Sequence, residues 1–430
     1  MSDPVLLDLK ALRQDTARVR AALASRGDYD GPLDEILALD AESRRTQLEC
    51  EDLQRRRNEL SVAFQQAKRA GKDVTAVQHE AETVKARLET VEPELKALRG
   101  KIADRMAWIP NLPHPEVPVG RDETANAVVK EWGTPRQLDF TPKPHWELGE
   151  ALGLFSVEGA ARLAGSGFAL FLGQGARLER ALINFMIDLH VREHGYVEVW
   201  PPALALRDVM FGTGQVPKFE DDMYRLERDD LFLIPTAEVQ LTNIHRGQTL
   251  AEADLPYRYV GFTHCFRREA GAAGRDTRGL IRLHQFDKVE LVKLVHPDNS
   301  EIELATLVNE ASTVLERLEL PYRVLALCTG DMSFASARTF DIELHAPGVG
   351  RWLEVSSCSN CTDFQARRAE IKFKPADGGK AAYVHTLNGS GVALPRLVIA
   401  ILENYQRADG TIAVPKALEP YVGCSVLECA

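Results

Sequence analysis

The chain has 430 residues, which is long for a single hydrophobic core, so its length predicts two domains. Hydrophobic residues make up 45% of the chain and charged residues 27%, and no uncharged apolar run reaches about 18 residues, which is typical of a globular protein without a membrane span. The formal net charge of −11 at pH 7 argues against a surface covered in positive potential, but it does not exclude nucleic acid, which binds to local patches.

The cysteines and the first twenty residues predict a cytoplasmic protein. Seven cysteines, an odd number in a long chain, do not suggest a disulfide framework. The segment MSDPVLLDLKALRQDTARVR lacks the apolar region and small-residue cleavage site of a secretory signal. We therefore expect the protein in the cytoplasm, with no membrane partner.

The region 33–105 has the pattern of two long helices joined by the polar turn at 68–74. Such helices must run antiparallel, and roughly 35 residues would make each on the order of 50 Å long. In the second helix, apolar residues alternate at spacings of four and three. This seam consists of Val77, Ala81, Val84, Leu88, Val91, Leu95, Leu98 and Ile102. The first helix has a similar seam at Ile36, Leu39, Cys50, Leu53, Leu60, Phe64 and Ala67, interrupted at Ser43, Thr46 and Arg57.

The hairpin raises one structural and one functional question. Pro93 lies inside the second helix, so we expect a kink near residues 89–92 unless the helix restarts there. By its pattern alone the hairpin could be a dimerisation coiled coil. Because a hairpin satisfies its own seam, its outer faces could instead bind a partner through the basic residues Arg55, Arg56, Arg57, Lys68 and Arg69.

A proline-rich passage, WIPNLPHPEVPVG at 108–120, separates the hairpin from the rest. Four prolines cannot continue a helix, so we place a domain boundary here, with an N-terminal arm at 1–110 and a second domain at 111–430. In the second domain, apolar and β-branched stretches alternate with helical ones. This favours an α+β fold with a long antiparallel sheet over regular βαβ repeats.

The segment FTHCFRREAGAAGRDTRGLIRLHQF, residues 262–286, carries Arg267, Arg268, Arg275, Arg278 and Arg282. Residues 262–266 and 280–292 both read as strands, so the arginines lie on the loop of an antiparallel hairpin. A solvated surface loop would explain them, but guanidinium groups on a slim loop also suit phosphate oxygens. On the second strand Phe286 and Glu290 face the same side, which suits a stacked base beside an amine or hydroxyl.

Three further segments carry similar chemistry. In FLIPTAEVQLTN, Thr236 and Glu238 share a face of a predicted strand. In WLEVSSCSNC, Glu354 precedes two hydroxyls, Ser356 and Ser357, which suit a magnesium–phosphate unit. The glycine-rich stretch 389–391 precedes a predicted helix that carries Arg396, an arrangement that attracts phosphate. Each segment alone could be structural.

Together these segments resemble the bacterial type of seryl-tRNA synthetases, a class II aminoacyl-tRNA synthetase family. GYVEVWPPAL at 195–204 resembles class II motif 1, FRREAGAAGRDTRGLIRLHQFDKVE resembles motif 2, and GSGVALPRLVIAILENYQ resembles motif 3. TAE at 236–238 and EVSSCSNC from 354 are characteristic of the seryl branch. The resemblance implies a class II catalytic domain on an antiparallel sheet, a tRNA-binding arm, and a homodimer with Pro202 at its interface.

The resemblance also implies roles for individual residues. Arg267 and Arg396 are the implied catalytic residues: Arg267 would hold the α-phosphate and the serine carboxylate, and Arg396 the far phosphates. Glu269 would bind the adenine amino group and Phe286 would stack on adenine. The implied ATP-binding set also includes Arg268, Leu283, Glu354, Val355, Ser356 and Ser357, with Glu354 and Ser357 meeting Mg²⁺. The implied serine-binding set is Thr236, Ala237, Glu238, Arg267, Glu290 and Ser390.

The implied activity is that of a serine–tRNA ligase, which forms seryl-adenylate from L-serine and ATP with Mg²⁺ and transfers serine to tRNA(Ser). tRNA(Sec) stays open as a second acceptor. Two alternatives are a paralogue that charges another acceptor, such as a carrier protein, and a non-catalytic tRNA-binding regulator. No zinc is expected, because Cys358 and Cys361 lack a second ligand pair. The chain departs from the family pattern at Gly167, Thr362, Pro395 and Pro93.

Overall fold

The computed structural model describes residues 9–27, 29, 31–270 and 278–429. The chain forms two compact units, Met1–Ile109 and Pro110–Ala430. Among the helices of the described residues, none combines the length and the hydropathy needed to cross a membrane.

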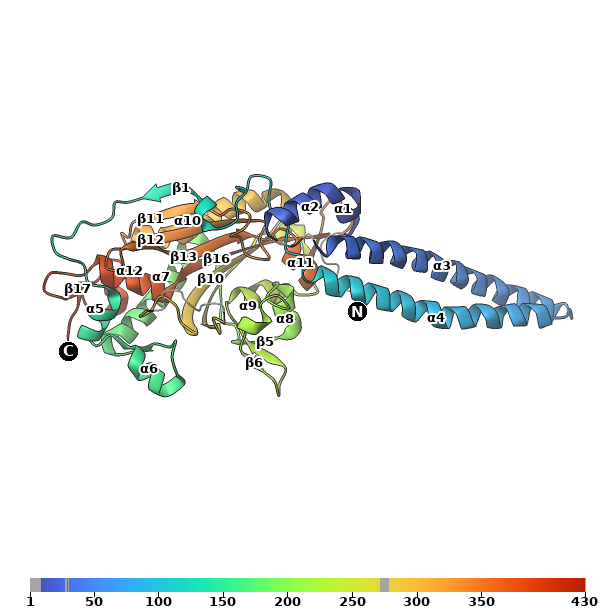
Figure 1. Cartoon of the computed structure of the whole chain (residues 1–430), viewed down its shortest axis with the longest axis horizontal. Helices are drawn as coiled ribbons and strands as arrows, with labels where there is room; N and C mark the ends of the chain where they lie inside the picture. The colour runs from blue at the N-terminus through green and yellow to red at the C-terminus, as the bar shows by residue number, and fades with distance from the viewer. Residues whose placement is uncertain (1–8, 28, 30, 271–277, 430) are drawn as a thin grey trace. The chain divides into compact units, whose positions relative to one another are not determined.

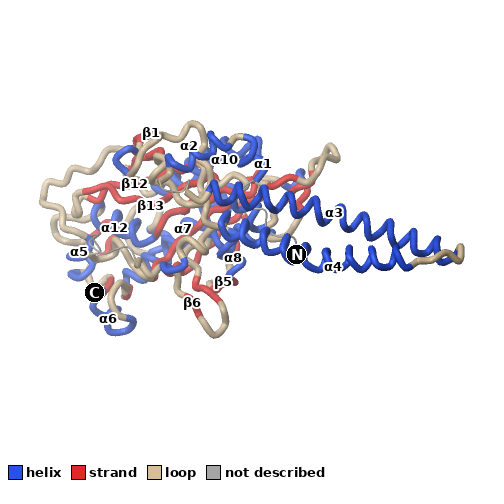
Figure 2. The backbone as a smooth tube through the Cα atoms, turned by 45° about the vertical axis from the view of Figure 1, so that its right-hand side comes forward, coloured by secondary structure: helices blue, strands red, loops and turns tan. Residues whose placement is uncertain are grey.

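The described part of the N-terminal unit is helical. Two short helices, α1 (Leu9–Gln14) and α2 (Thr16–Ser25), precede the long helices α3 (Leu33–Arg69) and α4 (Thr75–Met106). Figure 1 shows α3 and α4 side by side and antiparallel, and Figure 2 shows the short loop that joins them. The predicted helical hairpin is confirmed.

The seam between α3 and α4 contains the predicted apolar residues and, in addition, small polar ones. Cys50 and Leu60 of α3 pack with Val84, Leu88, Val91 and Leu95 of α4. Ser43 and Thr46, which we expected to interrupt the seam, are buried in α3 together with Asp40. Asp40 is held there by Arg13 of α1 at 2.9 Å and by Arg44 at 3.1 Å, so its buried charge is paired.

Pro93 does not end the second helix. Helix α4 continues from Thr75 to Met106 with Pro93 inside it, and the proline ring lies on the exposed side, away from the seam. The helix therefore does not restart at residues 89–92. An exposed proline removes one backbone hydrogen bond, while the buried residues Val91 and Leu95 on either side still pack against α3.

The second unit is built on one large sheet. Its strand order is β1-β11-β12-β13-β16-β10-β9-β4, and neighbouring strands are antiparallel except β4, which lies parallel to β9. The predicted fold class, a helical hairpin followed by a largely antiparallel sheet with helices, is confirmed. The eight strands are β1 (Ala127–Trp132), β4 (Val197–Val199), β9 (Tyr257–Phe266), β10 (Gln285–Val295), β11 (Tyr322–Ala326), β12 (Arg338–Ala346), β13 (Arg351–Asn360) and β16 (His385–Ala393).

Three helices bury one face of this sheet: α7 (Gly173–His194), α10 (Ser300–Arg317) and α12 (Leu394–Asn404). Their apolar residues join Val289 and Leu291 of β10 in one hydrophobic core. Because side chains alternate along a strand, the neighbouring residues Lys288 and Glu290 point to the other face, where they line a cavity.

Shorter elements surround the sheet. The helices are α5 (His145–Ala151), α6 (Val157–Ala164), α8 (Arg207–Gly212), α9 (Glu238–Thr242), α11 (Phe364–Ala369) and α13 (Glu419–Val422). The small sheets pair β2 (Phe155–Ser156) with β3 (Leu170–Phe171), β17 (Ile412–Ala413) with β18 (Val426–Leu427), β7 (Leu231–Leu233) with β5 (Leu204–Leu206) and β6 (Arg225–Leu226), and β14 (Lys372–Lys374) with β8 (Thr249–Ala251) and β15 (Ala382–Tyr383).

Candidate active site

A cavity of about 480 Å³ lies on the open face of the sheet, over β10, β13 and β16 and beside the start of α12. It brings together most of the residues that the sequence singles out. Its lining includes Thr236, Glu238, Arg267, Glu269, Leu283, Phe286, Glu290, Glu354, Val355, Ser357, Ser390 and Arg396. Three predicted residues, Arg268, Ala237 and Ser356, are not among its lining residues.

The arginine loop is carried by the antiparallel pair β9 and β10, as predicted. Phe262 pairs with Val289 and Phe266 with Gln285. The second strand begins at Gln285 and not at residue 280, because backbone groups of residues 278–284 bond outside the hairpin: the Leu280 amide donates to His145, and the His284 amide donates to the Gly167 carbonyl at 2.7 Å. Of the five arginines, Arg275 lies outside the described residues.

Arg267 is directed into the cavity by its surroundings. Its guanidinium carbon lies 5.2 Å from the centre of the Phe286 ring, and Nε donates to the Pro235 carbonyl at 3.4 Å. Glu269, at a positive φ of 54°, forms an ion pair with Arg282. Arg268 is exposed and does not line the cavity, although its backbone amide donates at 2.8 Å to the carbonyl of Asp222, which does.

Strand β10 contributes three side chains to the cavity at alternate positions. Phe286 and Glu290 share a face, as predicted, and Lys288 lies between them. The Lys288 ammonium forms an ion pair with Glu290, whose side chain is buried. Sequence reasoning missed Lys288, although the same period-two alternation would have found it.

Thr236 and Glu238 do not share a strand face, which corrects the sequence prediction. Strand β7 ends at Leu233, and Glu238 begins helix α9. The reason is local: Pro235 has no N–H to extend the strand pairing, and the Thr236 hydroxyl accepts the Glu238 amide at 3.1 Å, which favours a helix start. Both side chains still line the cavity, and Thr236 Oγ1 donates to Glu290 Oε2 at 3.1 Å.

Glu238 lies in an unusual electrostatic setting. Its Oε1 accepts hydrogen bonds from Gln365 Nε2 at 2.6 Å and Asn388 Nδ2 at 3.1 Å. Burial, and then the nearby charge of Glu290, raise the pKa of Glu238 to about 7, despite these donors. The ionised form of Glu238 is therefore destabilised, and an incoming cation such as an ammonium group would stabilise it.

A bulge in β13 brings Glu354 and Ser357 to the same side. Ile342 of β12 pairs with Ser356, and the next residue, Glu343, pairs with Glu354, so Val355 is an extra residue in the ladder. Glu354 and Ser357 therefore both line the cavity although they are three residues apart. Ser356 faces the other way and donates to the Ser390 carbonyl at 2.6 Å.

The start of α12 places Arg396 against the same strand. Its Nη1 donates to the Glu354 carbonyl at 2.6 Å and lies 3.3 Å from Glu354 Oε2. Ser390 on β16 lines the cavity, paired with Glu290 across the strands. The flanking glycines serve the core instead of the ligand: a Cβ at Gly389 would press on Cys358, and one at Gly391 on Val289.

Comparison with known proteins decides the family. Residues 6–113 match the seryl-tRNA synthetase N-terminal domain, and residues 218–405 match the tRNA synthetase class II core domain (G, H, P, S and T). The serine–tRNA ligase of Thermotoga maritima is 50% identical over 424 residues, which cover 98% of this chain and 100% of that protein. The serine–tRNA ligase of Pseudothermotoga lettingae is 48% identical over the same shares. The crystal structure of seryl-tRNA synthetase from Pyrococcus horikoshii complexed with ATP has a TM-score of 0.94 at 37% identity, covering 99% of this chain and 100% of that chain.

The chain belongs to the seryl-tRNA synthetase family. This confirms the resemblance read from the sequence motifs, and it places the chain among the class II aminoacyl-tRNA synthetases.

Two departures from the seryl-tRNA synthetase pattern have a structural explanation. Gly167 has a positive φ of 84°, and a Cβ there would clash with the ring of His284, whose amide donates to the Gly167 carbonyl at 2.7 Å. Pro395 occupies the first turn of α12, where a proline costs no intrahelical hydrogen bond.

Sequence reasoning missed one acidic residue that lies beside Ser357 and near Glu354. Asp341 of β12 pairs with Ser357 of β13, and its Oδ1 is buried with no hydrogen-bond partner among the residues that the structure describes. Burial, and then the charge of Glu354, raise the pKa of Asp341 well above its ordinary value. Two carboxylates and a hydroxyl beside Arg396 form the oxygen-rich donor set that suits Mg²⁺ bound together with phosphates. Cys358 and Cys361 are buried free thiols.

Proposed function

We propose that this chain is a serine–tRNA ligase that activates L-serine with ATP and transfers it to tRNA(Ser). The observation that carries this proposal is the combination within one cavity of Arg267, the Phe286 ring, the half-buried carboxylate Glu238 and the buried carboxylate Glu290. The first two suit a nucleotide, and the carboxylates suit the ammonium and hydroxyl of a small amino acid. The relatives named serine–tRNA ligase, about half identical over nearly the whole chain, support the same reading.

The ATP site would extend from Phe286 to Arg396. The adenine would stack on Phe286, with its amino group toward Glu269 and the backbone near Leu283, and Arg267 and Arg396 would bind the phosphates. The serine carboxylate attacks the α-phosphorus in line, so the protein's task is to position both reactants and offset negative charge. This step needs no general base on the protein.

Glu354 and Ser357 would hold Mg²⁺ with the phosphates, and we add Asp341 as a further oxygen ligand because it pairs with Ser357 and its buried Oδ1 has no hydrogen-bond partner within the described part of the chain. A bound magnesium ion supplies positive charge to the phosphate oxygens. Arg396 contributes from the protein side, since its guanidinium already lies beside Glu354.

The serine site would lie between Glu238 and the Glu290–Lys288 pair. Thr236 and Glu238 would receive the serine ammonium, and Glu290 and Ser390 would bind its hydroxyl. When alanine enters, the buried polar groups of Glu290 and Lys288 would lose a partner, which costs more than a lost methyl contact. Threonine would be rejected by crowding around its extra methyl group.

The arm would bind tRNA through its basic outer faces. Arg55, Arg56, Arg57, Lys68 and Arg69 are all exposed on α3, where they can contact phosphates. tRNA(Sec) is a second acceptor that we include in the proposal. The competing use of the hairpin as a dimerisation coiled coil is less favoured, because α3 and α4 already bury their seam against each other.

We also propose a homodimer through β4 and the residues that follow it. Strand β4 is the edge of the large sheet, with one side of its backbone unpaired by any described strand. Beside it Trp200 is 79% exposed and Val197 is 59% exposed, and Pro202 is exposed as well. An exposed apolar edge strand is a natural contact for a second copy.

Charging of total tRNA with serine tests the proposed function against its alternatives. We expect serine-dependent esterification of tRNA(Ser). A protein that forms seryl-adenylate but charges no tRNA would point to another acceptor, such as a carrier protein. A protein that binds tRNA without forming adenylate would be the non-catalytic regulator.

A further inference from the structure

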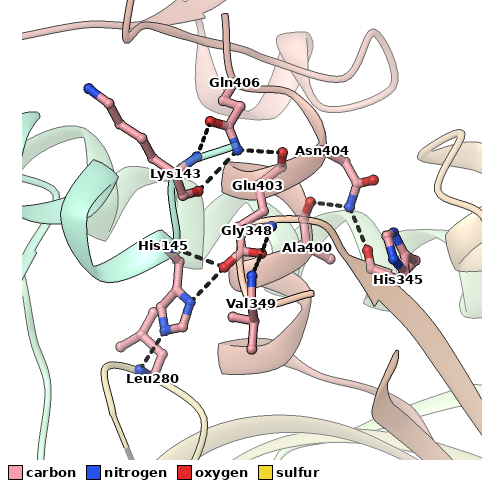
Figure 3. A network of polar contacts seen from close by, with 10 residues as sticks. All are labelled: Lys143, His145, Leu280, His345, Gly348, Val349, Ala400, Glu403, Asn404 and Gln406. Atoms are coloured by element: carbon pink, nitrogen blue, oxygen red, sulfur yellow. Dashed lines mark hydrogen bonds and ion pairs between the residues drawn. The ribbon is translucent and has the colours of Figure 1, made fainter. Parts of the chain in front are cut away.

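A buried carboxylate on α12 links this helix to two separate segments of the chain (Figure 3). Glu403 is fully buried and lies in the last turn of α12, the helix that carries Arg396 in its first turn. Its Oε2 accepts the amides of Gly348 at 2.8 Å and Val349 at 3.0 Å, in the turn between β12 and β13. Its Oε1 accepts the amide and the ring of His145, both at 2.9 Å.

The contacts of His145 fix its tautomer. The Leu280 amide donates to His145 Nε2 at 3.1 Å, so Nε2 must carry a lone pair. The proton of a neutral ring is then on Nδ1, which donates to Glu403 Oε1. Figure 3 shows the His145 ring between Glu403 and Leu280. The imidazole therefore connects α12 to the chain segment at Leu280 through one hydrogen bond on each side.

That segment, residues 278–283, is the returning side of the arginine loop, and we call it the return limb. Leu280, Ile281, Arg282 and Leu283 all line the cavity. Helix α5 contacts the return limb a second time, since the Arg278 guanidinium lies 4.5 Å from the centre of the Trp146 ring. At Gly279, with a positive φ of 66°, a Cβ would clash with His145 Nε2.

We propose that His145, oriented by Glu403, is a positioning residue: it holds the backbone of the return limb at the distance from Phe286 that is required to bind the adenine of ATP. This inference rests on the proposed placement of adenine between Phe286 and Leu283. The anchor for Leu280 is fully buried, and the Arg282–Glu269 ion pair lies two residues further along the same limb. Displacing the limb would therefore move both the backbone at Leu283 and the carboxylate at Glu269.

The Glu403 carboxylate also holds the turn between β12 and β13. Gly348 and Val349 form the turn of the hairpin whose strands carry Asp341 and Glu354. The side chain of Gln406 binds the backbone just before α5: it accepts the Lys143 amide at 2.9 Å and donates to the Lys143 carbonyl at 3.1 Å. The C-terminal end of α12 thus anchors both the return limb, through His145, and the turn of the β12–β13 hairpin.

Two substitutions of His145 separate its two hydrogen bonds. An asparagine amide approximates the Nδ1 position and can still donate to Glu403, whereas a glutamine oxygen approximates Nε2 and can still accept the Leu280 amide. We expect His145→Asn to raise the KM for ATP about tenfold in serine-dependent pyrophosphate exchange, with the KM for serine nearly unchanged. His145→Gln should restore most of the ATP affinity.

A second pair of variants tests the limb from its other side without changing His145. Gly279→Ala should also raise the KM for ATP selectively, because the new Cβ pushes the limb away from His145. Gly153→Ala is the matched control, since Gly153 has a similar φ of 64° with no atom within 4 Å of the added Cβ. Thermal unfolding of each variant shows whether it is folded, and the Gly279 pair decides the question if the His145 variants do not fold.

The outcomes distinguish this inference from the proposed function. If the unmodified chain shows no serine-dependent exchange, the proposed function is wrong. If exchange is normal and His145→Asn and Gly279→Ala leave the KM for ATP unchanged, or raise the KM for serine equally, then His145 stabilises the fold only and the inference is overturned.

Discussion

At the scale of single residues, Glu238 ties activity to pH. Its pKa is about 7 in the folded chain, against an ordinary value of 4.5. At pH values between these two, Glu238 therefore holds a proton in the folded chain that it has lost in the unfolded chain. The stability contributed by this protonated form is therefore present at low pH and is lost as the pH rises through about 7. Serine binding has the opposite dependence, because its ammonium needs the ionised carboxylate.

We therefore predict that the KM for serine falls about tenfold between pH 6 and pH 8. The measurement is serine-dependent pyrophosphate exchange across this range, with the KM for ATP as the internal control. Glu238→Gln should weaken serine binding and remove the pH dependence. A KM for serine that is independent of pH would place the ammonium elsewhere.

Glu290 distinguishes the serine site from the nucleotide site. It contacts Thr236 and Lys288 and is nearly inaccessible to solvent. We predict that Glu290→Ala raises the KM for serine by at least tenfold, since a buried partner of the substrate hydroxyl is lost, while ATP binding changes much less. Equal losses for both substrates would mean that Glu290 supports the nucleotide or the fold; Glu290→Gln, which keeps the volume, serves as the control.

At the scale of secondary-structure elements, the sequence is informative where one periodicity persists. The α3–α4 hairpin and the shared face of Phe286 and Glu290 follow from spacings of three, four and two. The bulge at Val355, the helix start at Glu238 and the bond from Leu280 to His145 do not, because each depends on one local irregularity or on a partner more than a hundred residues away. The position of Asp341 beside Ser357 likewise requires the strand register.

The arm shows which basic residues are available to a polyanion. Arg55 pairs with Asp52, and Arg56 pairs with Glu80 on α4. Among the described residues no ion pair is found for Arg57, Lys68 or Arg69. Cations that are already paired have less charge to offer to phosphate.

We predict that replacing Arg57, Lys68 and Arg69 together by alanine raises the KM for tRNA several-fold and makes its dependence on salt less steep, by about one unit of slope per lost contact. The Arg55→Ala, Arg56→Ala double variant should have a smaller effect. Charging rates at several salt concentrations provide the measurement. A triple variant with unchanged tRNA dependence would remove these residues from the binding surface.

At the scale of the whole molecule, the two compact units have separate cores. The seam of the arm is formed by residues of α3 and α4, and the main core of the catalytic unit is formed by its sheet and the helices α7, α10 and α12. We predict that deleting residues 1–109 leaves a folded protein that still makes seryl-adenylate but barely charges tRNA. Full charging by the truncated protein would contradict a role of the arm in tRNA binding, and loss of adenylate formation in a folded product would contradict the boundary.

The central claim is that the cavity around Arg267 activates serine with ATP. The most direct measurement is pyrophosphate exchange with serine, alanine and threonine, for the unmodified chain and for Arg267→Ala. We predict exchange with serine far above the other two amino acids, and a loss of about a hundredfold or more in the variant with its thermal stability retained, because Arg267 would contact both reactants. Near-normal exchange in a folded Arg267→Ala protein, or no preference for serine in the unmodified chain, would contradict the account.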